Sequence, residues 1–252
     1  MKPRVGLIGC GTIGRYIAER IEQDPDLVLS FIMEPDRVQA QGFESYLVSS
    51  YAEAEAKGAD LVVEAANPAV VRDAALEVLR FADFMVFSLS AFLEDAFRER
   101  VASFCEQHKR RVYVPHGAIL GVDGIADGRE VIDSVEITTV KKPKSYGRDD
   151  TVRTDVYEGP ARKACELYPR NVNVHAILAL TGLGFDNTVS RIVSDPAAPG
   201  NSHLITVKGD GFRFTIEVFS ESKGLVTGTY TPVSAFNSIK RVLVRPYGFT
   251  AV

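Results

Sequence analysis

A glycine-rich turn near the N-terminus has the spacing that suits a bound dinucleotide. Three glycines form the pattern G-x-G-x-x-G directly after the apolar run Val5 to Ile8 and at the start of a helical pattern. The first glycine of such a turn permits a tight bend, the second lets the backbone approach a diphosphate, and the third lets helix and strand pack closely. The alternative is that these glycines only punctuate a turn. The residues that we expect to contact the cofactor are Gly9, Gly11, Thr12, Ile13 and Gly14.

An acidic residue follows at the distance that a ribose contact requires. Glu34 lies twenty residues beyond Gly14, at the end of the apolar run Leu27 to Met33. A carboxylate there binds the adenosine ribose hydroxyls and repels a 2′-phosphate, which favours NAD over NADP. Arg37 lies three residues further on and suits a 2′-phosphate, so NADP stays open. The other interpretation of this stretch is a solvated loop.

Four histidines are the candidates for acid–base chemistry, because the sequence shows no metal-ligand spacing and no nucleophile motif. His108 lies in a polar segment and is expected at the surface. His175 lies in an apolar helical stretch, where a packed or surface position is favoured over catalysis. His116 follows the apolar run Arg111 to Pro115, at the end where open α/β sheets bind their ligands. His116 is therefore a candidate for a cleft residue.

His203 is the fourth histidine and precedes a short strand pattern. It shares side-chain parity with Ile205 and Val207 and follows a turn-like segment at 199–202. The alternation predicts a half-buried strand histidine. The pattern by itself does not make His203 functional.

The elements that must position these residues change in character along the chain. Up to about Pro115, strand-like runs alternate with helical patterns and short turns, which predicts a doubly wound parallel sheet. The expected strands are Val5–Ile8, Leu27–Met33, Asp60–Ala65, Phe84–Ser88 and Arg111–Pro115, and the expected helices follow Gly14 and span Ala69–Phe81 and Glu94–His108.

The second half has the pattern of an α+β domain. Lys208 to Gly211 is a hairpin signal between two strand patterns. We predict a Rossmann-type domain over residues 1–116 and 234–252, with the tail helix returning to it, and an α+β substrate and dimerisation domain over 117–233. Its expected elements are a strand at Val131–Val140, helices at Gly159–Cys165 and Asn173–Leu180, and antiparallel strands at Val189–Val193, Leu204–Val207 and Phe212–Phe219.

Composition limits the partners. The 252 residues carry 29 basic and 33 acidic side chains and a net charge of −4, so no overall positive field attracts nucleic acid. Apolar runs are far shorter than the about 20 residues that cross a bilayer, and no signal peptide is expected. Three widely spaced cysteines fit a reducing compartment and no disulfide framework or metal site. We expect a cytoplasmic protein with a small-molecule ligand.

Segments along nearly the whole chain resemble the L-aspartate dehydrogenase family. The resemblance is most specific in the stretch Tyr-Pro-basic-Asn-x-Asn-Val, which is rarer than a glycine turn. The matching segments are Gly-Leu-Ile-Gly-Cys-Gly-Thr-Ile-Gly at 6–14, Val-Glu-Ala-Ala at 63–66, Gly-Ala-Ile-Leu-Gly-Val-Asp-Gly-Ile at 117–125, Ala-Arg-Lys-Ala-Cys-Glu-Leu-Tyr-Pro-Arg-Asn-Val-Asn-Val at 161–174, Gly-Leu-Gly-Phe-Asp at 182–186 and Asn-Ser-His at 201–203.

The resemblance implies a reaction and residues for it. Members of the family deaminate L-aspartate oxidatively with NAD or NADP to iminoaspartate, then oxaloacetate and ammonia, and the imine can feed NAD biosynthesis. The family's catalytic histidine falls on His203, and cofactor contacts fall on Ala118 and Asn173. We place His116 and Asn171 on the substrate side. The resemblance also implies a homodimer and a dicarboxylate substrate. A dicarboxylate needs cations, and several are available in the second half, although each taken singly is expected to be a solvated surface residue: Lys141, Lys142, Lys144, Arg148 and Arg170.

Three departures from the family pattern make this a divergent member. His116 and His175 stand where members usually carry small residues, and the family's Asn-Pro-Lys-Thr-Ser segment is replaced by residues 223–234, including Lys223, Gly224 and Leu225. Two alternatives therefore stay open. One is an oxidoreductase on the same scaffold that acts on a different amino, imino or keto acid, and the other is a nicotinamide-binding sensor without turnover.

Overall fold

The computed structural model describes residues 1–221 and 229–244, and the chain divides into two compact units. The first unit comprises Met1–Ser88, Arg98–Pro115 and Pro232–Val252, and the second comprises Leu89–Phe97 and His116–Thr231. Lys223, Gly224 and Leu225 of the divergent segment, and the last eight residues of the predicted first domain, lie outside the described residues. No helix within the described ranges is long and apolar enough to cross a membrane.

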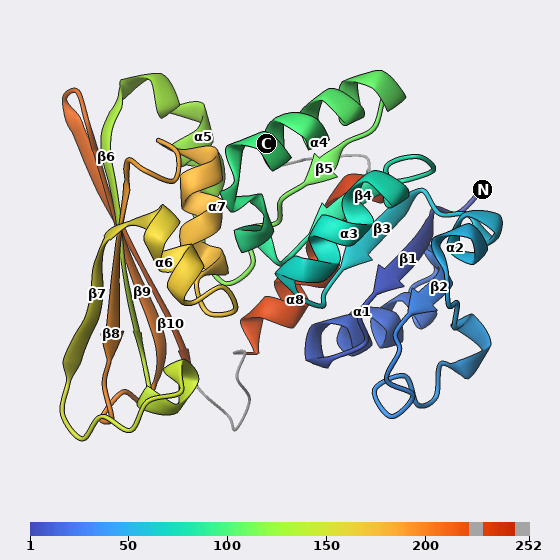
Figure 1. The fold of residues 1–252 in the computed structure, drawn as a ribbon, viewed down its shortest axis with the longest axis horizontal. Coiled ribbons are helices and arrows are strands. Elements are labelled where there is room, and N and C mark those ends of the chain that lie inside the picture. Colours follow the sequence, from blue (N-terminus) through green and yellow to red (C-terminus); the bar gives the residue numbers. More distant parts are fainter. Residues whose placement is uncertain (222–228, 245–252) are drawn as a thin grey trace. The chain divides into compact units, whose positions relative to one another are not determined.

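The first unit is built on a five-stranded parallel sheet with the strand order β2-β1-β3-β4-β5 (Figure 1). This confirms the predicted doubly wound α/β class, although the helix α2 was not expected. The strands are β1 (Arg4–Ile8), β2 (Val28–Met33), β3 (Leu61–Glu64), β4 (Asp83–Val86) and β5 (Val112–Tyr113). The helices are α1 (Thr12–Glu22), α2 (Tyr51–Lys57) and α3 (Pro68–Val78), with a short 3-10 turn at Glu44–Tyr46. Most of α4 (Asp95–His108) and of α8 (Tyr230–Leu243) also belongs to this unit.

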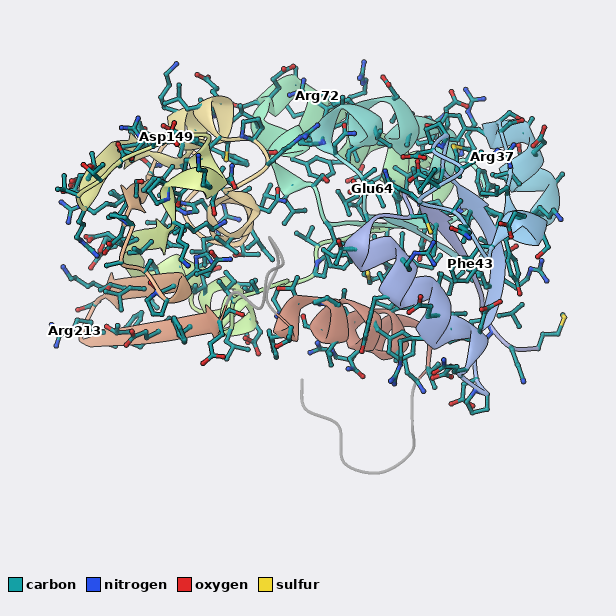
Figure 2. All side chains as sticks on the ribbon, turned by 90° about the horizontal axis from the view of Figure 1, so that it is seen from below. Arg37, Phe43, Glu64, Arg72, Asp149 and Arg213 are labelled. Carbon is teal, nitrogen blue, oxygen red and sulfur yellow. The ribbon has the colours of Figure 1, made fainter. Side chains whose placement is uncertain are left out.

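One apolar cluster joins the sheet to α1 and to the tail helix α8. The helical spacing of apolar residues in both helices gives each a stripe that is buried against the strands. Lys240 of α8 also donates a hydrogen bond to the Asp24 carboxylate at 2.7 Å, just after α1. The cluster includes Ile17, Ala18 and Ile21 of α1, Ala235, Phe236 and Ile239 of α8, Val5, Leu7, Leu61, Val63 and Met85 of the sheet, and Phe43, which Figure 2 labels.

The second unit contains a five-stranded mixed sheet with the order β10-β9-β6-β8-β7. Helices α5, α6 and α7 lie on one of its faces (Figure 1). The strands are β6 (Ile132–Lys141), β7 (Thr154–Pro160), β8 (Thr188–Ser194), β9 (Gly200–Gly209) and β10 (Phe212–Glu221). The helices are α5 (Val122–Asp127), α6 (Ala161–Leu167) and α7 (Asn173–Thr181), with 3-10 turns at Arg129–Val131 and Pro143–Tyr146.

Strand pairing in this sheet agrees with the sequence in part. The hairpin at Lys208 to Gly211 joins antiparallel β9 and β10, as predicted. However, β8 is parallel to β6 and antiparallel only to β7, whereas the sequence pattern had indicated antiparallel strands throughout. Strand β7 was missed because Glu158, Gly159 and Pro160 disrupt its alternation.

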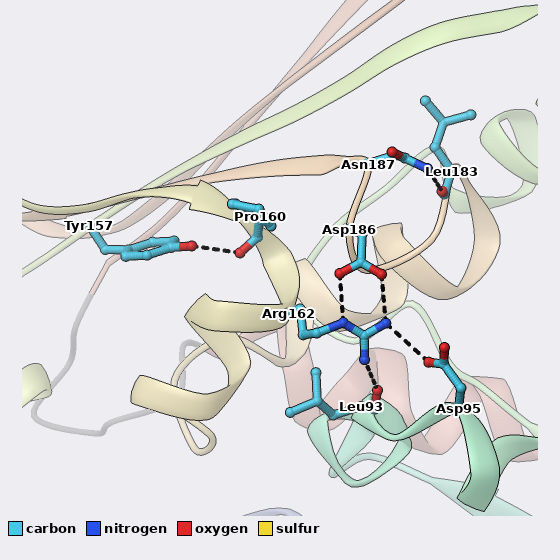
Figure 3. A network of polar contacts seen from close by, with 8 residues as sticks. All are labelled: Leu93, Asp95, Tyr157, Pro160, Arg162, Leu183, Asp186 and Asn187. Atoms are coloured by element: carbon cyan, nitrogen blue, oxygen red, sulfur yellow. Dashed lines mark hydrogen bonds and ion pairs between the residues drawn. The ribbon is translucent and has the colours of Figure 1, made fainter.

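The segment Leu89–Phe97 belongs to the second unit, although the predicted first domain, residues 1–116, contains it. Arg162 of α6 holds this segment, as Figure 3 shows: its guanidinium donates to the Leu93 carbonyl at 2.6 Å and to the Asp95 carboxylate at 3.0 Å. The same guanidinium forms a two-pronged pair with Asp186 at 2.6 and 2.8 Å. These carboxylates raise the pKa of Arg162, so its charge is permanent. Contacts between residues so far apart in the chain leave no local sequence signal.

Alanine at Gly14 tests the packing of the glycine turn. Its Cβ would meet the Gly9 carbonyl oxygen, which is backbone and cannot rotate away. We expect Gly14→Ala to lower the free energy of unfolding by about 1–3 kcal/mol, as overpacking does. Gly124→Ala in α5 is the matched control, because nothing lies within 4 Å of its added Cβ. Denaturant unfolding should show the control unchanged or up to about 1 kcal/mol more stable. Equal losses in both variants would contradict the close contact.

Candidate functional site

The predicted glycine turn closes tightly over the carboxyl ends of β1 and β3. Gly9 has φ +96°, its N–H donates to the Met33 carbonyl at 2.9 Å, and a Cβ there would lie 2.8 Å from the Ala65 carbonyl oxygen. Gly14 lies against Gly9 in the first turn of α1. Only glycine fits these two positions, which keeps the backbone of the turn bare of side chains.

The position of this turn suits an anionic ligand. In the sheet, β2 lies on one side of β1 and β3 lies on the other, so the strand order reverses at β1. Open α/β sheets bind ligands outside the carboxyl ends of the strands at such a point. The first N–H groups of α1, at Thr12, Ile13 and Gly14, have no partner within the helix. They and the helix dipole can hold a diphosphate.

Glu34 is fixed at the same edge of the sheet. Its carboxylate accepts a hydrogen bond from the Cys10 N–H at 2.8 Å and another from the Asp36 N–H at 2.9 Å. The acid predicted to bind ribose is thus bonded to the glycine turn itself. Arg37, the residue that kept NADP open, is exposed in the loop that follows.

Glu64 is a further residue at this edge that the sequence analysis did not single out. It is fully buried at the end of β3, and its carboxyl accepts from the Ser88 hydroxyl at 2.7 Å and from the N–H groups of Ala66 and Ser88 at 2.7 and 3.0 Å. Burial raises the pKa of Glu64, and these hydrogen bonds oppose the rise. Glu64 therefore ties the ends of β3 and β4 together. The sequence signal for Glu64 was a single acidic residue at the end of an otherwise apolar strand.

In the second unit, His203 lies in β9 on the face that α7 covers. Its side chain is 4% exposed, and its ring Nδ1 is 2.9 Å from the Thr139 hydroxyl of β6, its direct cross-strand neighbour. The predicted parity is correct, since Ile205 and Val207 are buried beside it. The ring Nε2 makes no hydrogen bond with any described residue, which leaves it available to a ligand.

His175 lies close to His203, which the sequence did not predict. It is fully buried in α7, with Nε2 2.7 Å from the Thr139 hydroxyl and Nδ1 2.8 Å from the Ser190 hydroxyl of β8. One threonine hydroxyl therefore lies between two imidazoles. Helical periodicity marked His175 as a packed residue, but it could not show what the ring meets.

A partly buried cation lies near the two histidines. Lys141 follows Thr139 by two residues on the same face of β6, and its Nζ donates to the Asn171 carbonyl at 3.1 Å. Burial lowers the pKa of Lys141 to about 8, because the interior disfavours the ammonium. Among the cations available in the second half, Lys141 is the one that the structure brings to His203.

Burial and the nearby ammonium also set the charge of the histidines. Burial first, and then the positive charge of Lys141, lower the pKa of His203 to about 3. Burial lowers the pKa of His175 well below its ordinary value, and His203 and Lys141 add to that effect. Both rings are consequently neutral at physiological pH.

Asn173 is the first residue of α7, and its side-chain Oδ1 is buried without a hydrogen-bond partner in the part of the chain that the structure describes. A buried unpaired acceptor is costly, and a ligand donor such as an amide or hydroxyl would satisfy it. This fits the cofactor contact predicted for Asn173.

Ala118 and His116 lie in one turn before α5. The His116 Nδ1–H donates to the Ile119 carbonyl at 2.7 Å, and Ala118 lies inside the turn that this bond closes. The hydrogen bond gives His116 a local structural role.

The predicted site residues therefore fall into two groups. The glycine turn and Glu34 lie in the first unit, whereas Ala118, Asn171, Asn173 and His203 lie in the second.

Known protein families and relatives match this chain over most of its length. Residues 9–115 match the model described as homoserine dehydrogenase, NAD binding domain, and residues 123–242 match aspartate dehydrogenase, C-terminal. The L-aspartate dehydrogenase of Nitrosopumilus maritimus is 33% identical over 270 residues, covering 94% of this chain and 96% of that protein. The chain belongs to the L-aspartate dehydrogenase family. The Archaeoglobus fulgidus relative is 32% identical and covers 95% of both chains.

The fold comparison agrees. The crystal structure of aspartate dehydrogenase from Thermotoga maritima matches with a TM-score of 0.82 and 26% identity, over 99% of this chain and 100% of that chain. The family resemblance, the two-domain fold class, the class of NAD(P)-dependent amino-acid dehydrogenase and the NAD cofactor are thereby confirmed. The roles of individual residues stay predictions.

Proposed function

We propose that this protein oxidatively deaminates L-aspartate with NAD, giving iminoaspartate and then oxaloacetate and ammonia, with His203 as the general acid–base. The proposal rests on a buried, neutral imidazole and a partly buried ammonium, His203 and Lys141, on one face of the second sheet. The imidazole moves a proton, and the ammonium binds a carboxylate. Deamination of an amino acid that carries a second carboxylate uses the imidazole for proton transfer and the ammonium for binding a carboxylate.

The residues present suit the cofactor. The N–H groups at the start of α1 would hold the diphosphate, Glu34 the adenosine ribose, and Asn173, with its unpaired buried oxygen, a polar group of the nicotinamide half. When bound, the nicotinamide accepts the hydride from the substrate α-carbon. Because Glu34 already lies at the glycine turn, a 2′-phosphate would meet a carboxylate there, which favours NAD.

His203 supplies the proton transfer. Its neutral ring can accept a proton at Nε2, either from the substrate ammonium group or from the water that attacks the imine, and can return it in the reverse direction. The low pKa keeps the ring unprotonated in the free enzyme across the whole physiological range. The proton is held only while a substrate carboxylate or the developing charge stabilises the imidazolium.

Lys141 is the group that we assign to a substrate carboxylate. Its hydrogen bond to the Asn171 carbonyl holds the Nζ in place and leaves two of its three donors for a ligand. In a buried setting, a charge-assisted hydrogen bond to a carboxylate is about twice as strong as a neutral one. In this proposal Asn171 acts on the substrate side through Lys141.

Turnover of L-aspartate with NAD, followed by the absorbance of the reduced nicotinamide, tests the proposed reaction. We expect activity with L-aspartate in the forward direction and with oxaloacetate and ammonia in reverse. His203→Ala should lower kcat about 10²-fold or more while cofactor binding, measured by fluorescence of the reduced nicotinamide, is retained.

Three outcomes would contradict parts of this assignment. Absence of turnover in both directions would overturn the substrate, and activity on another amino or keto acid would support the alternative oxidoreductase. Cofactor binding without any turnover would support the sensor. An unchanged rate in His203→Ala would overturn the role of the histidine.

Inhibition by succinate tests the role of Lys141, because this dicarboxylate does not titrate above neutral pH. The ammonium of Lys141 is charged below its pKa of about 8 and neutral above it. We therefore expect the inhibition constant to be nearly constant between neutral pH and the Lys141 pKa, and to rise by roughly tenfold per pH unit above that pKa. Lys141→Arg keeps its charge and should remove the rise, whereas Lys141→Met should bind succinate weakly at every pH. The same rise in all three proteins would contradict the assignment.

A further inference from the structure

Four buried polar side chains of the second unit form one hydrogen-bonded line. It runs from the Ser190 hydroxyl to His175 Nδ1 at 2.8 Å, from His175 Nε2 to the Thr139 hydroxyl at 2.7 Å, and from Thr139 to His203 Nδ1 at 2.9 Å. The first three residues are fully buried and His203 nearly so. Three strands and a helix, β6, β8, β9 and α7, each contribute one member.

Two arrangements of the protons use the Thr139 hydroxyl as both donor and acceptor. A threonine hydroxyl donates one hydrogen, and a neutral imidazole carries one N–H. The hydroxyl oxygen can also accept from both rings, but the buried O–H of Thr139 would then have no acceptor among the described residues, which is costly. The hydroxyl is used as both donor and acceptor when Thr139 donates to one ring and accepts from the other. If His203 carries its proton on Nδ1, Thr139 donates to His175 Nε2 and the His175 proton lies on Nδ1. If His203 carries its proton on Nε2, all three hydrogen bonds reverse together.

We propose that His175, acting through Thr139, is a positioning residue that holds His203 in one neutral tautomer with its Nε2 directed to the substrate. The choice of His203 as the acid–base group rests on the proposed function, whereas the coupling between the two rings does not. Both rings are kept neutral by burial, so the tautomer, and not the charge, is the property that the line controls.

The line fixes a tautomer and does not conduct protons. Its far end is Ser190, which is fully buried and whose hydroxyl bonds only to His175 among the described residues. A proton passed along the line would have to stay on a serine hydroxyl, which is a very poor base. The proton that His203 takes from a substrate must therefore return by way of Nε2.

The proposed reaction selects one of the two arrangements. A base at Nε2 requires the proton of His203 on Nδ1, donated to Thr139. Thr139 then donates to His175 Nε2, and the His175 Nδ1–H donates to Ser190. Each ring N–H is satisfied in this arrangement, and the Nε2 lone pair of His203 is left free.

Nitrogen-15 NMR of histidine-labelled protein measures the tautomers directly, without any substrate. The chain has four histidines, so His175→Leu and His203→Asn assign the two signals. We expect His203 to show one neutral tautomer, protonated on Nδ1, in the natural protein and in Thr139→Ser, which keeps the hydroxyl. Thr139→Val and His175→Leu should each give a mixture. A tautomer ratio unchanged in both variants would overturn the proposal.

The same spectra separate this inference from the proposed function. A single tautomer that is lost in Thr139→Val supports the coupling even if L-aspartate is not turned over. If that single tautomer carries its proton on Nε2, the coupling holds but a base role for His203 in the resting enzyme is wrong.

A double-mutant cycle shows whether His175 acts through Thr139. We expect Thr139→Val and His175→Leu each to lower kcat by about tenfold or more, a part of the about 10²- to 10⁴-fold that an acid–base group supplies. The double variant should be no slower than the slower single variant, because both changes break the same line. Additive losses would overturn the proposed route. Thr139→Ser, with near-natural kcat, controls for folding, and thermal melts verify that each variant is folded.

Discussion

The proposed chemistry depends on a buried imidazole and a partly buried ammonium on one face of a mixed sheet. Water would protonate His203 near pH 6.5 and keep Lys141 charged far above neutrality, and the interior shifts both pKa values downward. A neutral base then stands beside a cation that is still charged below about pH 8. Neither property belongs to the residues alone, since each follows from the surroundings that the fold gives them.

The sheet register determines which side chains share this face. Thr139 and His203 are direct cross-strand partners, and Lys141 follows two residues along β6, so a shift of one residue in either strand would turn these groups to the opposite face. The register is held by the buried alternation of Val135 and Ile137 against Ile205 and Val207. The apolar core therefore specifies the polar site.

How much of this was predictable differs between the two units. The glycine turn, Glu34 and the parallel sheet follow from local spacing, because a turn, a strand and a helix in sequence fix their own geometry. The face of the strand on which His203 lies also followed from local alternation with Ile205 and Val207. In contrast, the partnership of His175 with His203 through Thr139 joins residues from four elements, and no periodicity records it. Glu64 and the docking of Leu89–Phe97 on Arg162 were missed for the same reason.

We expect the C2–H bond of L-aspartate to be broken in this enzyme and its hydride to be transferred to NAD. Mass spectrometry of the reduced cofactor formed from L-aspartate deuterated at C2 tests it most directly. One deuterium should appear in the reduced nicotinamide, and almost no deuterated cofactor should form in the same time with His203→Ala. Reduced cofactor without deuterium, or none at all, would contradict it.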